Sequence, residues 1–289
     1  MISVVIISKD EAGLDATLTE VTAQAQACGP AEVMVVDASG SRLDRIRHRY
    51  ADRVRWIPFE PPAGVRVSIP HQRNVGVRAA QGDVIVFTDA GCQPEPGWLD
   101  RLVAPLRQDE HVAAGLTLAT PGSSGLYDES AQAARGTRYL AECPTINLAF
   151  RRAAFDAVGG FDESFAYGSD VDFSWRLVDR GYRIRNVPDA VIRHDWGGWR
   201  RQLRRSYVYG QARARLYRKH PSRLRRVLRT EPMVVAYPAF LLGLPLTLVF
   251  PLYPALLLIP AWRNRSNGAV RVLADHLTYG AGILSELLR

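Results

Sequence analysis

Acidic side chains follow two apolar runs in the first third of the chain, and a basic side chain lies between them. Asp37 ends the run 32–37, Asp89 ends the run 84–89, and Arg73 stands in the segment that joins them. A carboxylate at the end of a strand can hold a hard cation, and the cation can hold a diphosphate. The guanidinium fork of an arginine also matches phosphate geometry. The alternative at Asp89 is a carboxylate that only caps the following turn.

The order of apolar and helical segments indicates how these side chains come together. In the first hundred residues, β-branched runs alternate with helical segments, which predicts a parallel sheet with helices on both faces. In such a sheet, ligands bind beyond the carboxyl ends of the strands, where Asp37 and Asp89 stand. We expect strands at 3–8, 32–37, 54–57 and 84–87, and helices at 13–28, 41–50 and 72–81.

The second half of the chain is less regular. A Gly/Ser-rich segment opens the stretch 120–142, which we interpret as a mobile insertion over the site. A long basic helix is expected at 198–220. We also expect helices at 98–107 and 170–180, and strands at 112–119, 145–151, 183–187 and 190–193.

Two acids stand at the start of the helix expected at 170–180. A carboxylate that removes a proton from an attacking hydroxyl accelerates a reaction by typically ~10²–10⁴-fold, so Asp170 is a candidate general base. The alternative is that Asp170 caps the helix, a position for which Ser169 is the better candidate. Asp172 points to a different side of the helix, as an acceptor contact or a structural contact.

The C-terminal part differs in kind from the rest. Residues 232–262 contain no charged residue and five internal prolines. As a helix, the stretch would measure roughly 46 Å, longer than the ~30 Å hydrocarbon core, so a kinked span and a re-entrant hairpin both fit. An apolar stripe from Val270 to Leu288 predicts an interfacial amphipathic helix. The alternative is an apolar subdomain packed on the rest of the protein.

The net charge of +8 comes from one segment. Between Arg200 and Arg229 lie twelve of the 37 basic residues and no acid. Beside an apolar stretch, such a cluster favours an anionic membrane surface over nucleic acid, for which no recognition motif is present. The three cysteines show no metal spacing and suggest a reducing compartment, and the N-terminus enters a strand pattern without a signal peptide. No oligomeric state is predicted.

Six short motifs occur in order along the chain. They are Ser3 to Ser8, Val35-Val36-Asp37, Arg73-Asn74-Val75-Gly76, Phe87-Thr88-Asp89-Ala90-Gly91, Gly159-Gly160-Phe161-Asp162 and Ser169-Asp170-Val171-Asp172. Their order and distances resemble the family-2 glycosyltransferases. The resemblance covers about residues 1–220 and implies the GT-A fold, a mostly parallel α/β sheet flanked by helices. It also implies a nucleotide-sugar donor and inversion of the anomeric centre.

The resemblance implies a role for each motif. Asp170 matches the catalytic base, Asp37 the contact to the nucleotide base, and Arg73 a contact to the donor diphosphate. Ser8 and Glu11 are expected on the donor side as well.

The metal motif of the family departs from its usual form here. Asp89 matches the first acid of the motif, but Gly91 replaces the second acid. Asp89 with water could still hold Mg²⁺ or Mn²⁺. His194 follows a short strand where relatives place a further metal ligand; the alternative for this histidine is a structural role. The missing acid also motivates a rival interpretation, a catalytically silent GT-A-like scaffold at the membrane.

The resemblance and the tail together predict a membrane-associated hexosyl- or related transferase. Trp196 and Trp199 are expected on the acceptor side, since tryptophan stacks on sugar rings and also anchors at membrane interfaces. We expect a lipid-linked glycan or another envelope component as acceptor, at the cytoplasmic face of the membrane. The expected division is a donor half 1–95, an acceptor half 96–220, and a basic linker with a membrane-associated helical tail 221–289.

Overall fold

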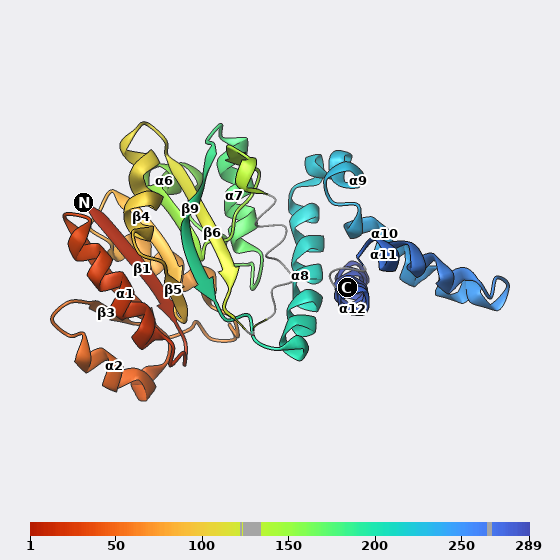
Figure 1. Cartoon of the computed structure of the whole chain (residues 1–289), viewed down its shortest axis with the longest axis horizontal. Helices are drawn as coiled ribbons and strands as arrows, with labels where there is room; N and C mark the ends of the chain where they lie inside the picture. Colours follow the sequence, from red (N-terminus) through yellow and green to blue (C-terminus); the bar gives the residue numbers. More distant parts are fainter. Residues whose placement is uncertain (122, 124–133, 265–267) are drawn as a thin grey trace. The chain divides into compact units, whose positions relative to one another are not determined.

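The computed structural model describes residues 1–121, 123, 134–264 and 268–289. These residues form two compact units, Met1–Asp195 and Trp196–Arg289 (Figure 1). We expected the catalytic part to reach residue 220. Instead, the basic helix α8 (Trp199–Lys219) belongs to the C-terminal unit, because it packs lengthwise against the last helix of the chain.

The N-terminal unit begins with the parallel sheet that the sequence predicted. Strand β1 pairs in parallel with both β2 and β4, and β2 pairs in parallel with β3. The register places Ser8 beside Asp37 and Ile7 beside Asp89, so both acids leave the sheet at the same edge. The strands are β1 (Ile2–Ser8), β2 (Ala31–Asp37), β3 (Arg55–Pro58) and β4 (Val84–Asp89).

The remaining strands make the sheet mixed, and the expectation of a mostly parallel sheet was wrong for this half. The order is β3-β2-β1-β4-β8-β6-β9-β5, with β7 also pairing to β9. Strand β8 runs antiparallel to both of its neighbours, because it returns the chain between β4 and β6. The strands are β5 (Cys92–Pro94), β6 (Val112–Ala119), β7 (Tyr139–Leu140), β8 (Asn147–Arg151) and β9 (Ile184–His194).

Strand β9 is a single strand where we expected two. Its register against β6 shifts between Gly115 and Leu116, so Pro188 and Asp189 fall in an irregularity of the ladder rather than in a loop. Since proline cannot donate to a ladder, a local break of this kind is where a strand tolerates it. The strand therefore continues to His194, at the edge of the sheet that carries Asp89.

Helices cover both faces of the sheet (Figure 1). One face carries an aromatic core in which Phe87 and Phe150 of the sheet meet Phe161 and Phe173. This core fixes the start of α7 relative to β4. The helices of the unit are α1 (Leu14–Ala27), α2 (Asp44–Arg49), α3 (Ile69–Ala79), α4 (Trp98–Val103), α6 (Arg152–Val158) and α7 (Ser169–Asp179), with short turns η1 (Gly40–Leu43), η2 (Ala104–Arg107) and η3 (Ala134–Gly136).

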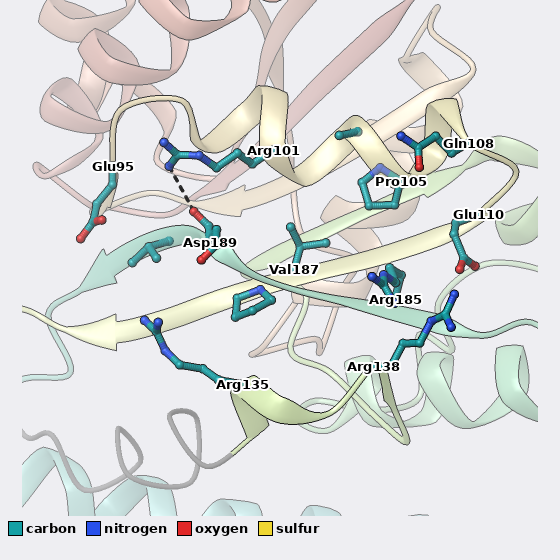
Figure 2. Close-up of a pocket in the computed structure, with 13 residues that line it drawn as sticks. Glu95, Arg101, Pro105, Gln108, Glu110, Arg135, Arg138, Arg185, Val187 and Asp189 are labelled. Atoms are coloured by element: carbon teal, nitrogen blue, oxygen red, sulfur yellow. Dashed lines mark hydrogen bonds between the residues drawn. The ribbon is translucent and has the colours of Figure 1, made fainter.

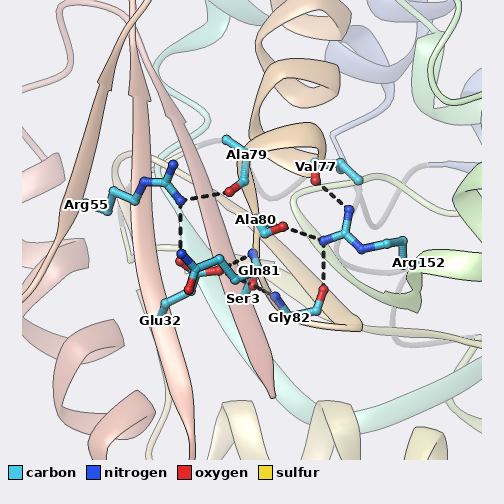
Figure 3. Close-up of polar contacts among 9 residues, drawn as sticks. All are labelled: Ser3, Glu32, Arg55, Val77, Ala79, Ala80, Gln81, Gly82 and Arg152. Atoms are coloured by element: carbon cyan, nitrogen blue, oxygen red, sulfur yellow. Dashed lines mark hydrogen bonds and ion pairs between the residues drawn. The ribbon is translucent and has the colours of Figure 1, made fainter.

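Polar contacts join the end of α3 to residues near the starts of β1 and β2, at the other end of these strands from Asp37 (Figure 3). Arg152 donates hydrogen bonds of 2.7–2.8 Å to the carbonyl oxygens of Val77, Ala80 and Gly82, which stabilises the C-terminal end of α3. Glu32 accepts hydrogen bonds of 2.6 Å from the Ser3 hydroxyl and the Gln81 amide. The side chains that support α3 therefore lie away from the strand ends that carry Asp37 and Asp89.

The C-terminal unit is helical and contains a broken apolar hairpin. After α8 come η4 (Pro221–Arg226), α9 (Val227–Thr230), α10 (Met233–Leu242), η5 (Leu244–Leu248), η6 (Tyr253–Leu257), α11 (Leu258–Arg263) and α12 (Ala269–Leu287). The Tyr253 ring stacks on Phe240 and its hydroxyl donates to the Phe240 carbonyl at 3.0 Å, so the chain folds back on itself. Among the described residues, no helix is long and apolar enough to cross a membrane.

Helix α12 packs on α8 through a face that differs from the apolar stripe we expected. A buried Asp275 accepts hydrogen bonds from Gln202 and Ser206. Glycines allow the close approach, since a Cβ on Gly210 would lie 2.1 Å from the Tyr279 carbonyl oxygen. Two residues of the expected stripe, Val270 and Leu288, stay exposed.

Candidate functional site

The carboxyl ends of β1, β2 and β4 bring the expected donor-side residues together. Ser8 and Asp37 are both 3% exposed, and they are register partners. Asp37 is held in place, because Ser39 donates to one carboxylate oxygen and the Trp56 indole donates to the other at 3.3 Å. A fixed carboxylate at this edge can accept hydrogen bonds from a ligand, as expected of Asp37.

Arg73 projects from α3 toward Asp89. Its Nη2 atom lies 3.7 Å from Asp89 Oδ1, which is an ion pair but too long for a hydrogen bond. The Arg73 side chain is only 6% exposed, and its Nε has no hydrogen-bond partner among the described residues. Asp89 Oδ1 is likewise buried without a hydrogen-bond partner in the part of the chain that the structure describes. Buried polar atoms of this kind are costly unless a ligand satisfies them.

Asp170 stands at the start of α7, close enough to Arg73 for their charges to interact. Burial raises the pKa of Asp170, and the Arg73 guanidinium opposes this shift. Asp170 Oδ1 accepts a hydrogen bond from the Val171 amide at 2.9 Å. The expectation that Ser169 caps the helix was wrong: Gly168, with a φ of +82°, precedes the first turn, and no side chain caps it. A raised pKa brings a carboxylate closer to the value at which a general base works well near neutral pH.

Asp172 has a different environment from Asp170. Its side chain is completely buried, and it binds the Arg176 Nε and Nη2 atoms, each at 2.8 Å. Arg176 also donates to the Val158 carbonyl at 2.6 Å, which ties α7 to the end of α6. This is the structural contact that we gave as one of two roles for Asp172.

Glu142 lies near the candidate base, and the sequence did not single it out. It contributes to the raised pKa of Asp170, and one of its oxygens accepts a hydrogen bond from the Trp175 indole at 2.8 Å. It stands at the end of the expected insertion 120–142, much of which lies outside the described residues. The sequence of that insertion has no regular hydrophobic pattern. Nothing in the sequence could therefore predict that Glu142 lies near Asp170.

Gly91 and Glu11 meet near the turn after β4. The φ of Gly91 is +88°, a conformation that favours glycine. A Cβ at this position would lie 3.5 Å from the Glu11 carboxyl carbon. Glu11 is fixed by the Gly13 amide, which donates to its Oε1 at 3.1 Å. A carboxylate from a different part of the chain thus lies beside the position where the family's second acid is missing.

The described residues offer a divalent cation an incomplete set of protein ligands. They contain no group of three or more histidine, cysteine or acidic side chains suited to a metal. His194 pairs with Cys92 between β9 and β5, and its Nδ1 lies 3.6 Å from the Cys92 sulfur. The unpartnered Asp89 Oδ1 fits a cation such as Mg²⁺, which is often held by one or two carboxylates together with substrate phosphates and water.

The two tryptophans expected on the acceptor side belong to the other compact unit. Trp196 and Trp199 both lie in the unit that begins at residue 196. The Arg205 guanidinium lies 5.1 Å from the centre of the Trp196 ring and donates to the Trp196 carbonyl at 2.6 Å. Their role toward an acceptor stays a prediction.

Two family models match the chain. The model described as glycosyl transferase family 2 matches residues 3–161, more than half of the chain, and includes β1 to β4 with Asp37, Arg73 and Asp89. The chain belongs to glycosyl transferase family 2. A second model, glycosyl transferase family group 2, matches residues 130–262. The sequence-based resemblance to this family is thereby confirmed.

Individual relatives agree with this assignment. The chain is 30% identical over 184 residues to the pre-mycofactocin glycosyltransferase of Mycobacterium tuberculosis, covering 57% of this chain but only 37% of that relative. It is 24% identical to the glycosyltransferase AglE of Haloferax volcanii, over 78% of this chain and 77% of the relative.

A solved structure shows the same fold. The mannosyltransferase PcManGT of Pyrobaculum calidifontis, determined in complex with GDP-Man and Mn²⁺, is similar with a TM-score of 0.67 and 18% identity. The similarity covers 96% of this chain and 86% of the other. The expected GT-A-like architecture is thereby supported, with a mixed rather than mostly parallel sheet.

Proposed function

We propose that this glycosyltransferase moves a sugar from a nucleotide-sugar donor to a hydroxyl acceptor, with inversion of the anomeric centre. The observation that carries the proposal is the position of Arg73. It is nearly buried, 3.7 Å from Asp89, and within electrostatic reach of Asp170. The Arg73 guanidinium thus has a candidate donor-site acid, Asp89, and a candidate base, Asp170, within reach of its charge. This arrangement suits a donor diphosphate bound to Arg73 and an attacking hydroxyl beside Asp170.

The proposed reaction is a single displacement. The acceptor oxygen forms a bond to the anomeric carbon while the bond from that carbon to the diphosphate oxygen breaks. Asp170 takes the proton of the acceptor hydroxyl, and the nucleoside diphosphate leaves with the electron pair of the broken bond. Arg73 binds the diphosphate and stabilises its growing negative charge. Asp37 and Ser8, at the adjacent strand ends, bind the nucleoside, and Glu11 completes the donor side.

A divalent cation fits this arrangement. Asp89 would hold Mg²⁺ or Mn²⁺, and the bound cation would supply Lewis-acid stabilisation of the departing diphosphate. The structurally similar mannosyltransferase was determined with GDP-Man and Mn²⁺, which supports a nucleotide sugar and a cation here. His194 is proposed as a further ligand, since β9 ends at the same edge of the sheet.

A binding screen tests the donor side of the proposal. Thermal unfolding of the full chain would be measured with a panel of nucleotide sugars, with and without Mn²⁺. We expect at least one donor to raise the melting temperature of the wild type and to have no effect on Arg73→Gln. The matched control is Arg78→Gln, an exposed arginine on the same helix. A donor that stabilises wild type and Arg73→Gln equally contradicts the assignment of Arg73.

The stereochemistry tests the single displacement. NMR of the product formed from a donor of known configuration should show the opposite anomeric configuration. Retention would rule out the mechanism in which Asp170 acts as base in one step, while leaving the donor site intact.

We propose that residues 232–289 hold the protein at the cytoplasmic face of a membrane, where a lipid-linked glycan is the acceptor. Helix α10 has ten residues, about 15 Å of helix, which matches half of the ~30 Å hydrocarbon core. Apolar side chains at the turn of the hairpin are exposed, with Leu248 at 88% and Val249 at 82%. These lengths favour a hairpin that enters one leaflet. Trp196, Trp199 and the basic helix α8 would face the membrane surface and its acceptor.

Vesicle flotation tests this membrane contact. Each aliphatic side chain that enters the bilayer would contribute ~1.5–3 kcal/mol to binding, so Leu248→Glu with Val249→Glu should weaken binding to phosphatidylglycerol vesicles by at least about tenfold. Leu228→Glu changes an equally apolar, exposed position outside the hairpin and is the control. Equal flotation of the wild type and the hairpin variant contradicts the proposal.

A further inference from the structure

A group of arginines lies in the N-terminal unit along β9, away from the candidate donor site. A cavity of about 850 Å³ opens there between η2 and the segment 135–138, along β9 (Figure 2). Four arginines line it, namely Arg101, Arg135, Arg138 and Arg185. Arg185 precedes His194 by nine residues of strand, roughly 30 Å at ~3.3 Å per residue, so the Arg138 and Arg185 end of the cavity is separate from the donor site.

Three guanidinium groups converge on one tyrosine at this end. The guanidinium carbons of Arg183, Arg138 and Arg185 lie 4.6, 5.3 and 5.8 Å from the centre of the Tyr139 ring. The register explains the cluster, because Tyr139 is the strand partner of Arg185, and Arg183 lies two residues before Arg185, directly ahead of β9. The attraction of a cation to the ring is partly offset by repulsion among the three charges.

Among the described residues, the arginines of this cluster have no ion-pair partner. In the part of the chain that the structure describes, no carboxylate forms an ion pair with Arg138, Arg183 or Arg185. The Nη1 atom of Arg185 is buried and makes no hydrogen bond to any described residue. A buried donor on a charged group that lacks an acceptor is costly, so the arrangement favours an anionic ligand.

The carboxylates that line the cavity stand at different places along it. Glu110 accepts a hydrogen bond of 2.8 Å from the Tyr139 hydroxyl, and Glu95 pairs with Arg193 at 2.9 Å. Asp189 lies near Arg101, away from Arg138 and Arg185 (Figure 2), and its carbonyl accepts from Arg101 at 3.2 Å. Glu110 thus lies at the Tyr139 end of the cavity, where its single negative charge faces three arginines and leaves a net positive charge.

We propose that the cavity beside Tyr139 is an anion-binding site that takes a phosphate group through Arg138 and Arg185, with the charge of Arg183 nearby on the Tyr139 ring. Phosphate carries up to two charges and several acceptor oxygens, which matches several guanidinium forks better than a single carboxylate does. The group has two possible sources, a soluble phosphate compound or the headgroup of an anionic lipid. The site does not depend on the donor chemistry.

Calorimetric titration of the full chain with inorganic pyrophosphate in metal-free buffer tests the proposal. Arg138→Gln with Arg185→Gln should weaken binding at least about tenfold, the size expected from losing one or more charge-assisted hydrogen bonds. Arg73→Gln should retain this binding, since it changes only the donor site, and Arg107→Gln is a control for the loss of an exposed arginine paired to Asp100. Unchanged binding in the double variant would overturn the proposal.

Thermal unfolding separates a binding role from a structural one. Because the double variant removes like charges that repel one another, it should melt at the same or a higher temperature without ligand. In an Arg73→Gln background, where the donor diphosphate contact is removed, pyrophosphate should raise the melting temperature, and adding Arg138→Gln with Arg185→Gln should abolish that rise. A lower melting temperature that pyrophosphate still raises would show a structural role and overturn the site.

Vesicle flotation identifies the source of the phosphate. If phosphatidylglycerol vesicles bind the double variant more weakly than the wild type, with the hairpin unchanged, the site takes a lipid headgroup. If only pyrophosphate binding changes, the site takes a soluble phosphate compound. If the variant changes neither, the proposal is wrong.

Discussion

Asp170 and Asp172 stand two residues apart on α7, and we predict opposite effects from replacing each with asparagine. Asp172→Asn removes the charge that pairs with Arg176 through two contacts of 2.8 Å, at a side chain with no exposed surface. Breaking a buried ion pair by removing one partner costs about 3–5 kcal/mol. Because Arg176 keeps some solvent exposure and its bond to the Val158 carbonyl, we expect about 3 kcal/mol, or a melting temperature lower by ~6–12 °C.

Asp170→Asn should leave the fold intact and remove the chemistry. Burial raises the pKa of Asp170, which means that the folded environment disfavours its charged form. A neutral side chain of the same shape should therefore melt at the same or a higher temperature at neutral pH. Loss of the base should lower the turnover number by ~10²–10⁴-fold.

Two measurements on the purified variants decide the matter, namely thermal unfolding by circular dichroism and the initial rate of nucleoside diphosphate release. Below its melting temperature, Asp172→Asn should keep most of the wild-type rate. If Asp172→Asn melts like the wild type but loses activity, or Asp170→Asn loses activity only by unfolding, the division between a catalytic and a structural acid is refuted.

Three further outcomes are expected. The Arg73 charge lowers the pKa of Asp170, and transfer requires the charged form of Asp170. In Arg73→Gln, the acidic limb of the plot of turnover number against pH should therefore move to higher pH. An unmoved limb would contradict the electrostatic coupling of Arg73 to Asp170. EDTA should abolish transfer and Mg²⁺ or Mn²⁺ should restore it, but not in Asp89→Ala; full activity in EDTA contradicts the cation. Arg152→Ala removes three hydrogen bonds to carbonyls and should lower the melting temperature by ~4–10 °C, whereas Arg78→Ala should not. Equal effects of the two substitutions would contradict a stabilising role for the Arg152 hydrogen bonds at the end of α3.

The donor half of the fold was predictable because its signals are local. Buried parallel strands have continuous apolar runs, and their ends carry Asp37 and Asp89, so the elements and the shared edge followed from the pattern. The structure adds what no pattern contains, such as the 3.7 Å separation of Arg73 and Asp89.

The other half depended on contacts between distant segments. The antiparallel insertion of β8 between β4 and β6 and the continuation of β9 through Pro188 are decided by pairing, which composition does not reveal. Glu142 reaches Asp170 through the same long-range packing.

The compact C-terminal unit begins before the boundary that we expected at residue 220. The sequence placed the basic helix at the end of the catalytic part, whereas close packing on α12 through Gly210 and the Asp275 hydrogen bonds makes α8 a member of the second compact unit. A polar face that packs on another helix looks like a solvent-exposed face in sequence.

The most direct test of the proposed function is the release of nucleoside diphosphate from a donor that stabilises the protein, measured with Mg²⁺ or Mn²⁺ for the wild type and for Asp170→Asn. We predict release by the wild type, a rate at least about a hundredfold lower for Asp170→Asn, and unchanged donor binding. Equal rates of release for the two proteins would contradict the assignment of Asp170 as the base. A wild type that binds donors and releases no nucleoside diphosphate would contradict the proposed activity and favour a silent scaffold.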